Sequence, residues 1–329
     1  MIELNEIQKE AYKLIQSDAR FLYALIELRE RLDSNYVLMA MPYTGIFADG
    51  SEQWGRKVGI DTPVFNDQEK QYYAMIRSKH KLFELSYSEL YSTLYYEFKK
   101  SDEHFSSICE PIEKERNLYY NVGVDVSRNH YCGNTILCST HIPFYDFQKD
   151  TGEFMKNISV VAGRLCAFYD GHLPPAPLFK DEIEFKYQDH HFFAHCPLKR
   201  NDFDGFVLFS ILCNINYLRL FIDDFFIEEY PFKLRFAYLQ YYYLVCLMRE
   251  INTKLATEFV IDDKWMNNNF RNCMAHYGLG VEMTEDDIIV GDPMSGLTNK
   301  LFKTSYMQTK NAIYTELETL SKQLEDCLL

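Results

Sequence analysis

The sequence predicts a mostly α-helical protein, in which an α+β N-terminal part precedes a C-terminal antiparallel helical bundle. After residue 202, apolar residues recur at spacings of three, four and seven, the period of a buried helix face. Residues 118–147 and 182–195 lack this period and carry the β-branched and aromatic residues typical of short strands. A glycine and four prolines gather around 171–204, so we expect one domain over residues 1–196 and a second over residues 197–329.

The N-terminal domain should contain three long helices besides its strands. Asn66 is followed three residues later by Glu69, which is the pattern of a capping box and predicts a helix start. We expect these helices over residues 4–33, 66–101 and 152–169.

The C-terminal domain should contain four helices with short connections, as in an antiparallel bundle. Asp202 or Asp204 can cap the first helix, and Pro231 fits the first turn of the second, where its missing N–H costs nothing. Gly278 can end the third helix in a left-handed conformation. We expect the four helices over residues 202–227, 231–255, 263–277 and 299–327.

Composition excludes several classes of function. The 329 residues include 34 Lys and Arg against 48 Asp and Glu, a net charge of −14, which argues against sequence-independent coating of DNA. Hydrophobic residues make up 47% of the chain, enough for a sizeable core, but the most apolar stretch is too interrupted to predict a membrane span. The acidic start lacks the features of a signal peptide, and the nine cysteines form no CxxC pair. We therefore expect a cytoplasmic protein with reduced thiols and no membrane association.

The strongest chemical motif is Arg271-Asn272-Cys273-Met274-Ala275-His276. On a helix, Asn272 and His276 share a face, and Arg271 lies about 140° away from His276 around the axis. A histidine of near-neutral pKa can move a proton to or from a ribose oxygen, and an arginine can stabilise charge on a phosphoryl group. This chemistry needs no metal or other cofactor, and we expect none.

The motif resembles the R-x4–6-H motif of the HEPN superfamily, in which a polar residue, often Asn, follows the Arg. The resemblance covers about residues 202–329, with two long helices before the motif helix and one after it. It implies a HEPN-like helical bundle that commonly forms a homodimer, and a metal-independent endoribonuclease of toxin–antitoxin or phage-defence systems. It also implies that Arg271 and His276 are the catalytic pair, that Asn272 supports them, and that an antitoxin or defence-system protein is a possible partner.

Several residues near the motif are candidates for RNA binding. Asn268 and Asn269 precede Arg271 and could hydrogen-bond RNA, or one of them could simply cap the motif helix. Lys264, Lys300 and Lys303 could contact phosphates.

Three alternatives to catalysis remain. Arg271 and His276 could be structural, with Arg271 paired to a carboxylate and His276 closing the helix end. The domain could instead be a non-catalytic HEPN-like module for dimerisation or for binding a nucleotide or partner. A metal site formed by Asp189, His191 and His195 is a further, weaker candidate, since no second cysteine is nearby to complete a thiolate set.

Overall fold

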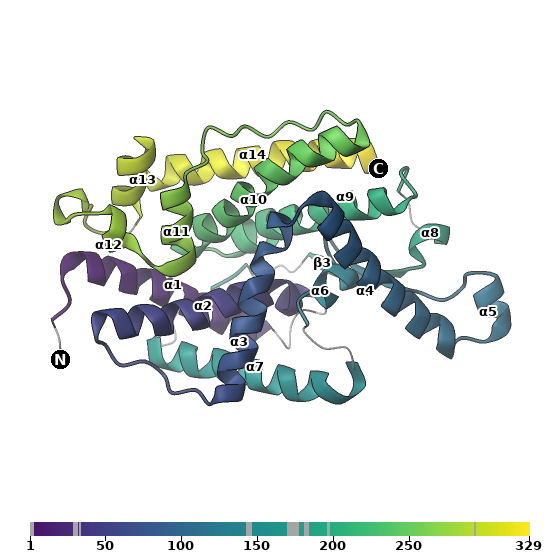
Figure 1. The fold of residues 1–329 in the computed structure, drawn as a ribbon, viewed down its shortest axis with the longest axis horizontal. Coiled ribbons are helices and arrows are strands. Elements are labelled where there is room, and N and C mark those ends of the chain that lie inside the picture. Colours follow the sequence, from purple (N-terminus) through teal and green to yellow (C-terminus); the bar gives the residue numbers. More distant parts are fainter. Residues whose placement is uncertain are drawn as a thin grey trace.

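The computed structural model describes residues 3–28, 32, 34–142, 147–169, 178–180, 184–195, 198–292 and 294–329; the side chains of 147–150 are outside this description. The described part contains fourteen α-helices and one small sheet, and 71% of the structure is helical (Figure 1). The mostly-α prediction is therefore confirmed.

The helices account for most of the chain. They are α1 (Glu6–Leu28), α2 (Tyr36–Val58), α3 (Asp67–Ser78), α4 (Tyr87–Ile108), α5 (Pro111–Glu115), α6 (Thr135–Ser139), α7 (Phe147–Tyr169), α8 (Phe192–His195), α9 (Phe203–Asn216), α10 (Pro231–Leu255), α11 (Asn268–His276), α12 (Leu279–Glu282), α13 (Ser295–Phe302) and α14 (Tyr306–Leu328). Two 3₁₀ turns, η1 (Lys79–Glu84) and η3 (Glu285–Asp287), and a π-helical segment, η2 (Tyr217–Phe225), join some of them.

The sheet has three antiparallel strands in the order β2-β1-β3. These are β1 (Val122–Ser127), β2 (His130–Asn134) and β3 (Phe185–His190). The β1–β2 ladder contains a bulge between Asp125 and Val126. Strands thus occur in both segments where they were expected, although each segment also contains a short helix, α6 or α8.

Several helix ends follow the sequence signals. Asn66 and Glu69 form the capping box of α3, Asp202 caps α9 by accepting from the Gly205 N–H, and Pro231 begins α10. These predictions depended only on residues within one turn, where local chemistry decides the conformation.

Other boundaries were wrong. The single helix expected over 66–101 is divided by η1, because Ser86 and Glu89 form a second capping box that starts α4. The helix expected over 299–327 is likewise divided, since Lys303 adopts a left-handed conformation (φ 59°) that ends α13. The motif helix begins at Asn268, five residues later than expected.

Helix α2 was not predicted, and it positions much of the candidate site. It contains Pro42 and three glycines, which obscure its helical signal, and it is buried over most of its length. Gly45 allows α3 to approach, because a Cβ there would lie 2.4 Å from the backbone N of Arg77. Gly50 leaves room for the ring of Tyr277, whose Cε2 would be 2.7 Å from an added Cβ.

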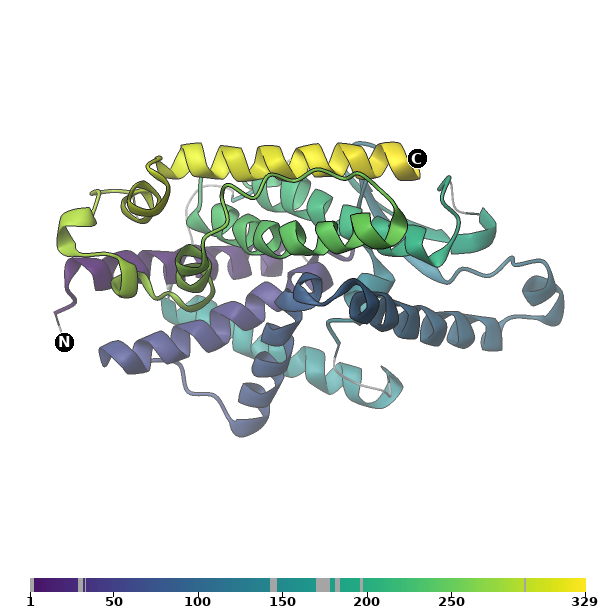
Figure 2. The ribbon, with the colours of Figure 1, turned by 45° about the horizontal axis from the view of Figure 1, so that its top comes forward.

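The hydrophobic core joins both halves of the chain. Helix α14 packs against α9 and α10, while α1 packs against α10 and α7 (Figure 2). One core cluster contains residues from both sides of the expected boundary, including Phe21, Phe47, Phe206 and Phe232. Residues 170–177, 181–183 and 196–197 near that boundary lie outside the description, and the division into two domains stays a prediction.

One apolar helical stretch is long enough to cross a membrane by length and composition. This stretch, Phe203–Phe225, has 89% of its most apolar window buried inside the structure. The core helix of a soluble protein has the same length, composition and burial.

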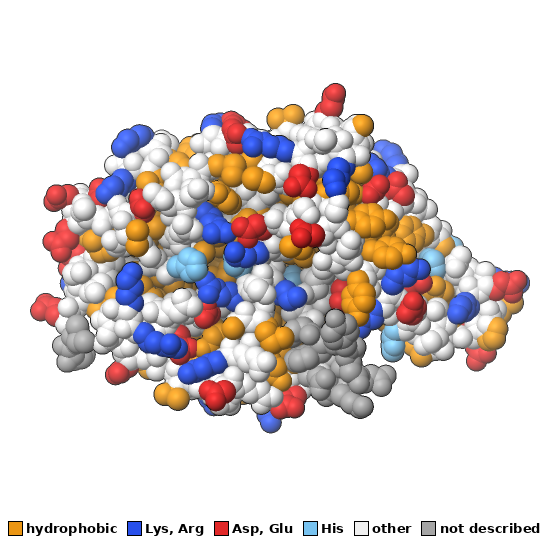
Figure 3. Space-filling model, viewed as in Figure 1, with side chains coloured by type: hydrophobic (Ala, Val, Ile, Leu, Met, Phe, Trp, Pro, Cys, Tyr) orange, Lys and Arg blue, Asp and Glu red, His pale blue; other side chains and the backbone are white. Residues whose placement is uncertain are grey.

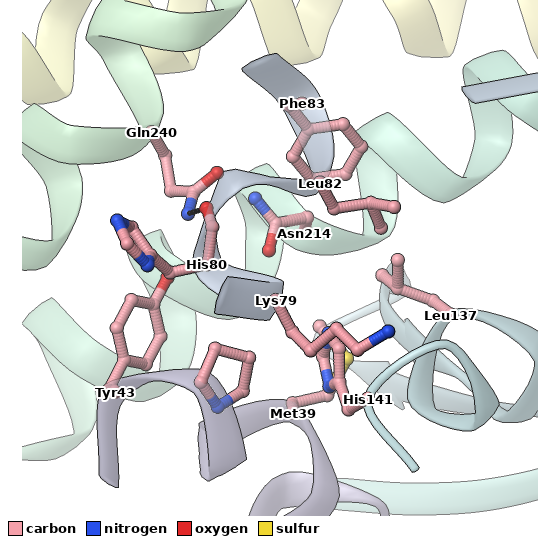
Figure 4. Close-up of a pocket in the computed structure, with 11 residues that line it drawn as sticks. Met39, Tyr43, Lys79, His80, Leu82, Phe83, Leu137, His141, Asn214 and Gln240 are labelled. Atoms are coloured by element: carbon pink, nitrogen blue, oxygen red, sulfur yellow. Dashed lines mark hydrogen bonds between the residues drawn. The ribbon is translucent and has the colours of Figure 1, made fainter. Parts of the chain in front are cut away.

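A small buried cavity of about 10 Å³ lies where α2, η1, α9 and α10 meet, with His80 and Gln240 among its lining residues (Figure 4). The His80 ring interacts with the Arg77 carbonyl through Nδ1 and with the Tyr243 hydroxyl, 3.2 Å from Nε2. Burial lowers the pKa of His80 to about 3 and that of His141, also at this cavity, to about 4.

Because the pKa values of these two histidines are lowered, we expect the free energy of unfolding to fall in acid. Below pH 6.5 the unfolded chain binds protons on both imidazoles, whereas the folded chain does so only near pH 3 to 4. The free energy of unfolding should therefore fall by about 2 kcal/mol per histidine between pH 7 and pH 5. Urea unfolding at the two pH values measures this, and a His80→Gln variant should lose about half of the dependence. An equal pH dependence in wild type and variant would contradict the assignment.

Candidate active site

The motif lies on α11, a short helix that begins after a side-chain N-cap and ends at a buried tyrosine. Asn267, rather than Asn268 or Asn269, is the N-cap, and its side chain accepts from the Phe270 N–H at 3.0 Å. Tyr277, rather than Gly278, takes the left-handed conformation (φ 53°) that ends the helix. A non-glycine residue in this region is strained by about 1–3 kcal/mol, so other contacts must hold it there.

A buried ionic cluster provides those contacts. Arg235 is hydrogen-bonded to Asp18 and to the Met274 carbonyl of α11, and its guanidinium lies 4.1 Å from the centroid of the Tyr277 ring. The Tyr277 hydroxyl donates to Asp18 Oδ2 at 2.6 Å. The residue directly after His276 is therefore fixed by α1 and α10, which also fixes where His276 can lie.

His276 contacts an arginine that comes from the N-terminal half. Arg77 Nη2, on α3, lies 2.8 Å from His276 Nδ1, and Arg77 is paired in turn with Asp49 of α2. A guanidinium can only donate, so Nδ1 must accept and the imidazole must be neutral with its proton on Nε2. Asp49, Arg77 and His276 thus form a chain in which each residue orients the next.

The electrostatics of His276 favour the neutral ring. Partial burial of the ring, followed by the positive charges of Arg77 and Arg271, lowers the pKa of His276 below the usual 6.5, while the charge of Asp49 raises it. His276 is therefore neutral at pH 7, the form that can accept a proton.

Arg271 points to a different set of partners. Its Nη2 lies 2.9 Å from Glu84 Oε1 on η1, and its Nη1 donates to Asn272 Oδ1 at 3.1 Å. The guanidinium also lies 5.5 Å from the centroid of the Tyr243 ring. Arg271 and His276 interact electrostatically, but each is held by its own partner, Glu84 for Arg271 and Arg77 for His276.

A groove of about 820 Å³ runs along one face of α11. This face presents Asn269, Asn272 and His276, at positions i, i+3 and i+7, so the helical repeat brings them together. The opposite side of the groove comes from α2 and the start of α1. The groove residues outside α11 that carry polar side chains are Asn5, Gln8, Gln53, Trp54, Lys57, Tyr277 and Glu282. On this face of the molecule, Lys, Arg and His side chains gather over α11, α2 and α3 (Figure 3).

The residues expected to bind RNA are only partly at this groove. Asn269 lines it, whereas Asn268 accepts a hydrogen bond from the Tyr242 hydroxyl. Lys264 is 2.9 Å from Asp262, and Lys300 is 2.7 Å from Asp287. The Lys303 ammonium lies 3.3 Å from the Lys300 carbonyl, and none of the three lysines lines the groove.

The candidate metal ligands do not converge. Asp189 lies on β3 and hydrogen-bonds Tyr187, whereas His195 lies on the separate turn α8. The rings of His191 and His195 are 6.3 Å apart between centroids, and His191 also packs edge-on against Tyr119. Within the described ranges, no three His, Cys, Asp or Glu residues gather closely enough to hold a metal ion.

Sequence reasoning missed Arg77, Asp49 and Lys57. Arg77 lies 199 residues before His276, so no spacing rule connects them. The one available signal was the basic run Arg77-Ser78-Lys79-His80-Lys81 in an acidic chain, which marks a positive segment but not its partner.

No protein-family model, curated protein or solved structure matches the chain.

Proposed function

We propose that the chain is a metal-independent endoribonuclease of the toxin or phage-defence type, with His276 as the general acid–base. One observation carries this proposal: a neutral histidine, oriented by Arg77 at 2.8 Å, lies on the wall of a groove beside Asn272. An oriented, neutral imidazole is suited to accepting a proton, and the guanidinium groups of Arg77 and Arg271 are suited to stabilising charge on a phosphoryl group. The resemblance of the motif to HEPN ribonucleases points to RNA as the substrate.

In the proposed cleavage, His276 accepts one proton from the ribose 2′-OH and later donates it to the leaving oxygen. The basic atom of the neutral ring is Nδ1, which accepts a hydrogen bond from Arg77. An RNA phosphate competes for the Arg77 donors and frees Nδ1, which then accepts the proton of the ribose 2′-OH. The 2′-oxygen bonds to phosphorus, the P–O5′ bond breaks, and the imidazolium returns its proton to O5′. The products are a 2′,3′-cyclic phosphate and a 5′-OH.

The alternative is a non-catalytic HEPN-like module for dimerisation or for binding a nucleotide or partner. One observation favours it: both motif side chains already have partners, Arg271 with Glu84 and His276 with Arg77. A purely structural pair would be satisfied in this way.

Cellular setting and partners follow from the same proposal. The eight described cysteines are all free thiols, which supports a cytoplasmic location. A homodimer and an antitoxin or defence-system partner are proposed from the family resemblance alone. A toxin-like nuclease should slow growth on expression, and a scaffold should not.

An RNA-cleavage assay with EDTA tests the proposal. Wild type should cut RNA to fragments with cyclic-phosphate ends, and Arg271→Ala should cut at least about 100-fold more slowly because it removes transition-state charge stabilisation. Lys322→Ala, which removes an exposed charge on α14 paired with Glu318, serves as the control and should cut normally. Cleavage that requires a metal, or equal rates in all three proteins, would show that the proposed chemistry is wrong.

Arg77→Gln should shift the pH profile of cleavage. Arg77 is the second-largest influence, after burial, that lowers the His276 pKa, so its removal raises that pKa toward 6.5. Activity that needs neutral His276 will then begin to fall at a higher pH as the solution is acidified. The measurement is kcat/KM from pH 4.5 to 8, beside Arg77→Lys, which keeps the charge and should keep the acidic limb in place. Superimposable profiles for wild type and Arg77→Gln would exclude this role.

Glu84→Gln should speed cleavage. It removes the carboxylate that holds Arg271, and an exposed pair of this kind is worth about 0.2–1 kcal/mol, or up to about fivefold in rate. Single-turnover rates measure the effect, and thermal unfolding should change little. A slower variant would mean that Glu84 positions Arg271 instead of restraining it.

A further inference from the structure

We infer that the groove beside His276 is a hydrogen-bond-donor track that binds the sugar–phosphate backbone of single-stranded RNA, with Asn5, Gln8 and Lys57 as its contacts outside the motif. The inference rests on the proposed function, because it names the substrate surface of the same site. The inference depends on the side-chain amides of Asn5, Gln8 and Asn272, whose oxygens form hydrogen bonds within the described part of the protein while their NH₂ groups do not.

The α1 start shows this asymmetry. Asn5 Oδ1 accepts from the Gln8 N–H at 2.8 Å, and Gln8 Oε1 accepts from the Asn5 N–H at 2.9 Å. Because backbone N–H groups can bond only to the oxygens, both NH₂ groups are left pointing elsewhere. Among the described residues, neither NH₂ group has a hydrogen-bond partner, and both residues line the groove.

The motif helix shows the same asymmetry on the facing wall. Asn272 Oδ1 accepts from Arg271, which leaves its NH₂ group available, and Arg77 occupies His276 Nδ1, which leaves Nε2–H. Lys57 adds an exposed ammonium that forms no ion pair within the described ranges. The groove therefore presents donors from three helices.

Few acceptors face these donors. Gln53 donates its NH₂ to Asp49 at 2.8 Å, so its oxygen is available, and Glu282 is the one carboxylate among the residues that line the groove. Among the polar side-chain groups of the groove, donors therefore outnumber acceptors, while Ile7, Val58 and Val281 make part of its lining apolar. Such a set of donors is complementary to a ligand rich in acceptors, and phosphate and ribose oxygens are such acceptors. The groove volume of about 820 Å³ suits a short single-stranded segment rather than a duplex.

Substitutions in the capping box of α1 can change the groove without changing the cap. Asn5→Asp and Gln8→Glu keep the oxygens that form the capping box, and Asp and Glu are favourable at these helix positions. Each variant replaces an NH₂ donor in the groove with a carboxylate oxygen. The variants should therefore fold like wild type, while the group that faces the groove changes from a hydrogen-bond donor to a negatively charged acceptor.

The test is binding of fluorescein-labelled 12-nucleotide RNAs with 2′-O-methyl riboses, which cannot be cleaved, measured by anisotropy on the full chain. Asn5→Asp, Gln8→Glu and Lys57→Gln should each weaken binding about tenfold or more, the loss of one hydrogen bond to a charged group. Lys57→Gln should also reduce the slope of log affinity against log salt by about one, whereas Lys322→Gln should have no effect on either. Oligo(U), oligo(A) and oligo(C) should bind alike, because backbone contacts carry no sequence information.

The outcomes separate the inference from the proposed function. Groove-dependent binding by a chain that never cleaves RNA would overturn the nuclease and keep the track. Cleavage or binding that all three groove variants leave unchanged would overturn the track and keep the nuclease. No binding by wild type, or affinity that differs strongly among the three homopolymers, would also overturn the track.

Discussion

Replacing His276 with Ala is expected to slow RNA cleavage by a factor of about 10²–10⁴, the usual contribution of a general acid–base group. His276 is partly exposed on the groove wall and does not belong to the hydrophobic core, so the variant should fold normally. The expected loss is in kcat, because a neutral imidazole adds little to binding of the ground state.

The matched control for this variant is His195→Ala. His195 is also exposed, but it lies on α8 and does not line the groove, so this variant should cleave at the wild-type rate. Thermal unfolding of both variants should match wild type. An unchanged rate in His276→Ala would remove His276 from the chemistry and leave the non-catalytic module as the better interpretation.

Replacing Arg235 with Met is expected to lower the free energy of unfolding by about 3–5 kcal/mol, because it leaves the Asp18 carboxylate buried without its cation. Both side chains are almost fully buried, with exposed fractions of 1% and 2%. The same substitution removes the hydrogen bond to the Met274 carbonyl and the contact with the Tyr277 ring. Urea unfolding followed by circular dichroism measures the loss.

A double variant separates the ionic effect from the packing effect. Asp18→Leu with Arg235→Met removes both charges, so it should recover a large part of the stability lost by Arg235→Met alone. We expect the recovered protein still to cleave slowly, because Tyr277 no longer has the carboxylate that accepts its hydroxyl. Equal stability of the single and double variants would argue that Arg235 contributes by packing and not by charge.

Local signals in the sequence predicted local structure well. The cap at Asn66, the cap at Asp202 and the start at Pro231 depend on side chains within one turn of the helix end, and the structure contains all three. The predicted end of α11 was wrong because contacts distant in the sequence decide it. Gly278 suits a left-handed cap by itself, but buried contacts with Asp18 and Arg235 hold Tyr277 in that conformation instead.

The motif was visible in the sequence, but its surroundings were not. The i, i+4 relation of Asn272 and His276 placed both on one face, and both line the groove. Arg77 and Lys57 come from helices in the N-terminal half, and contacts between residues so far apart in the chain depend on tertiary packing. Helix α2 was missed because its glycines serve close packing against α3 and Tyr277, and this need outweighs their poor helix propensity.

The clamp on Tyr277 has a consequence for how this chain can be recombined. Asp18 and Gly50, which hold Tyr277 and make room for it, both precede residue 197. A chimaera that joined residues 197–329 to an unrelated N-terminal part would keep the whole motif sequence. It would lose Asp18 and Gly50, which hold the residue that follows the motif in place. The position of the motif therefore depends on α1 and α2, and we expect the proposed nuclease activity to transfer to another protein only together with these helices.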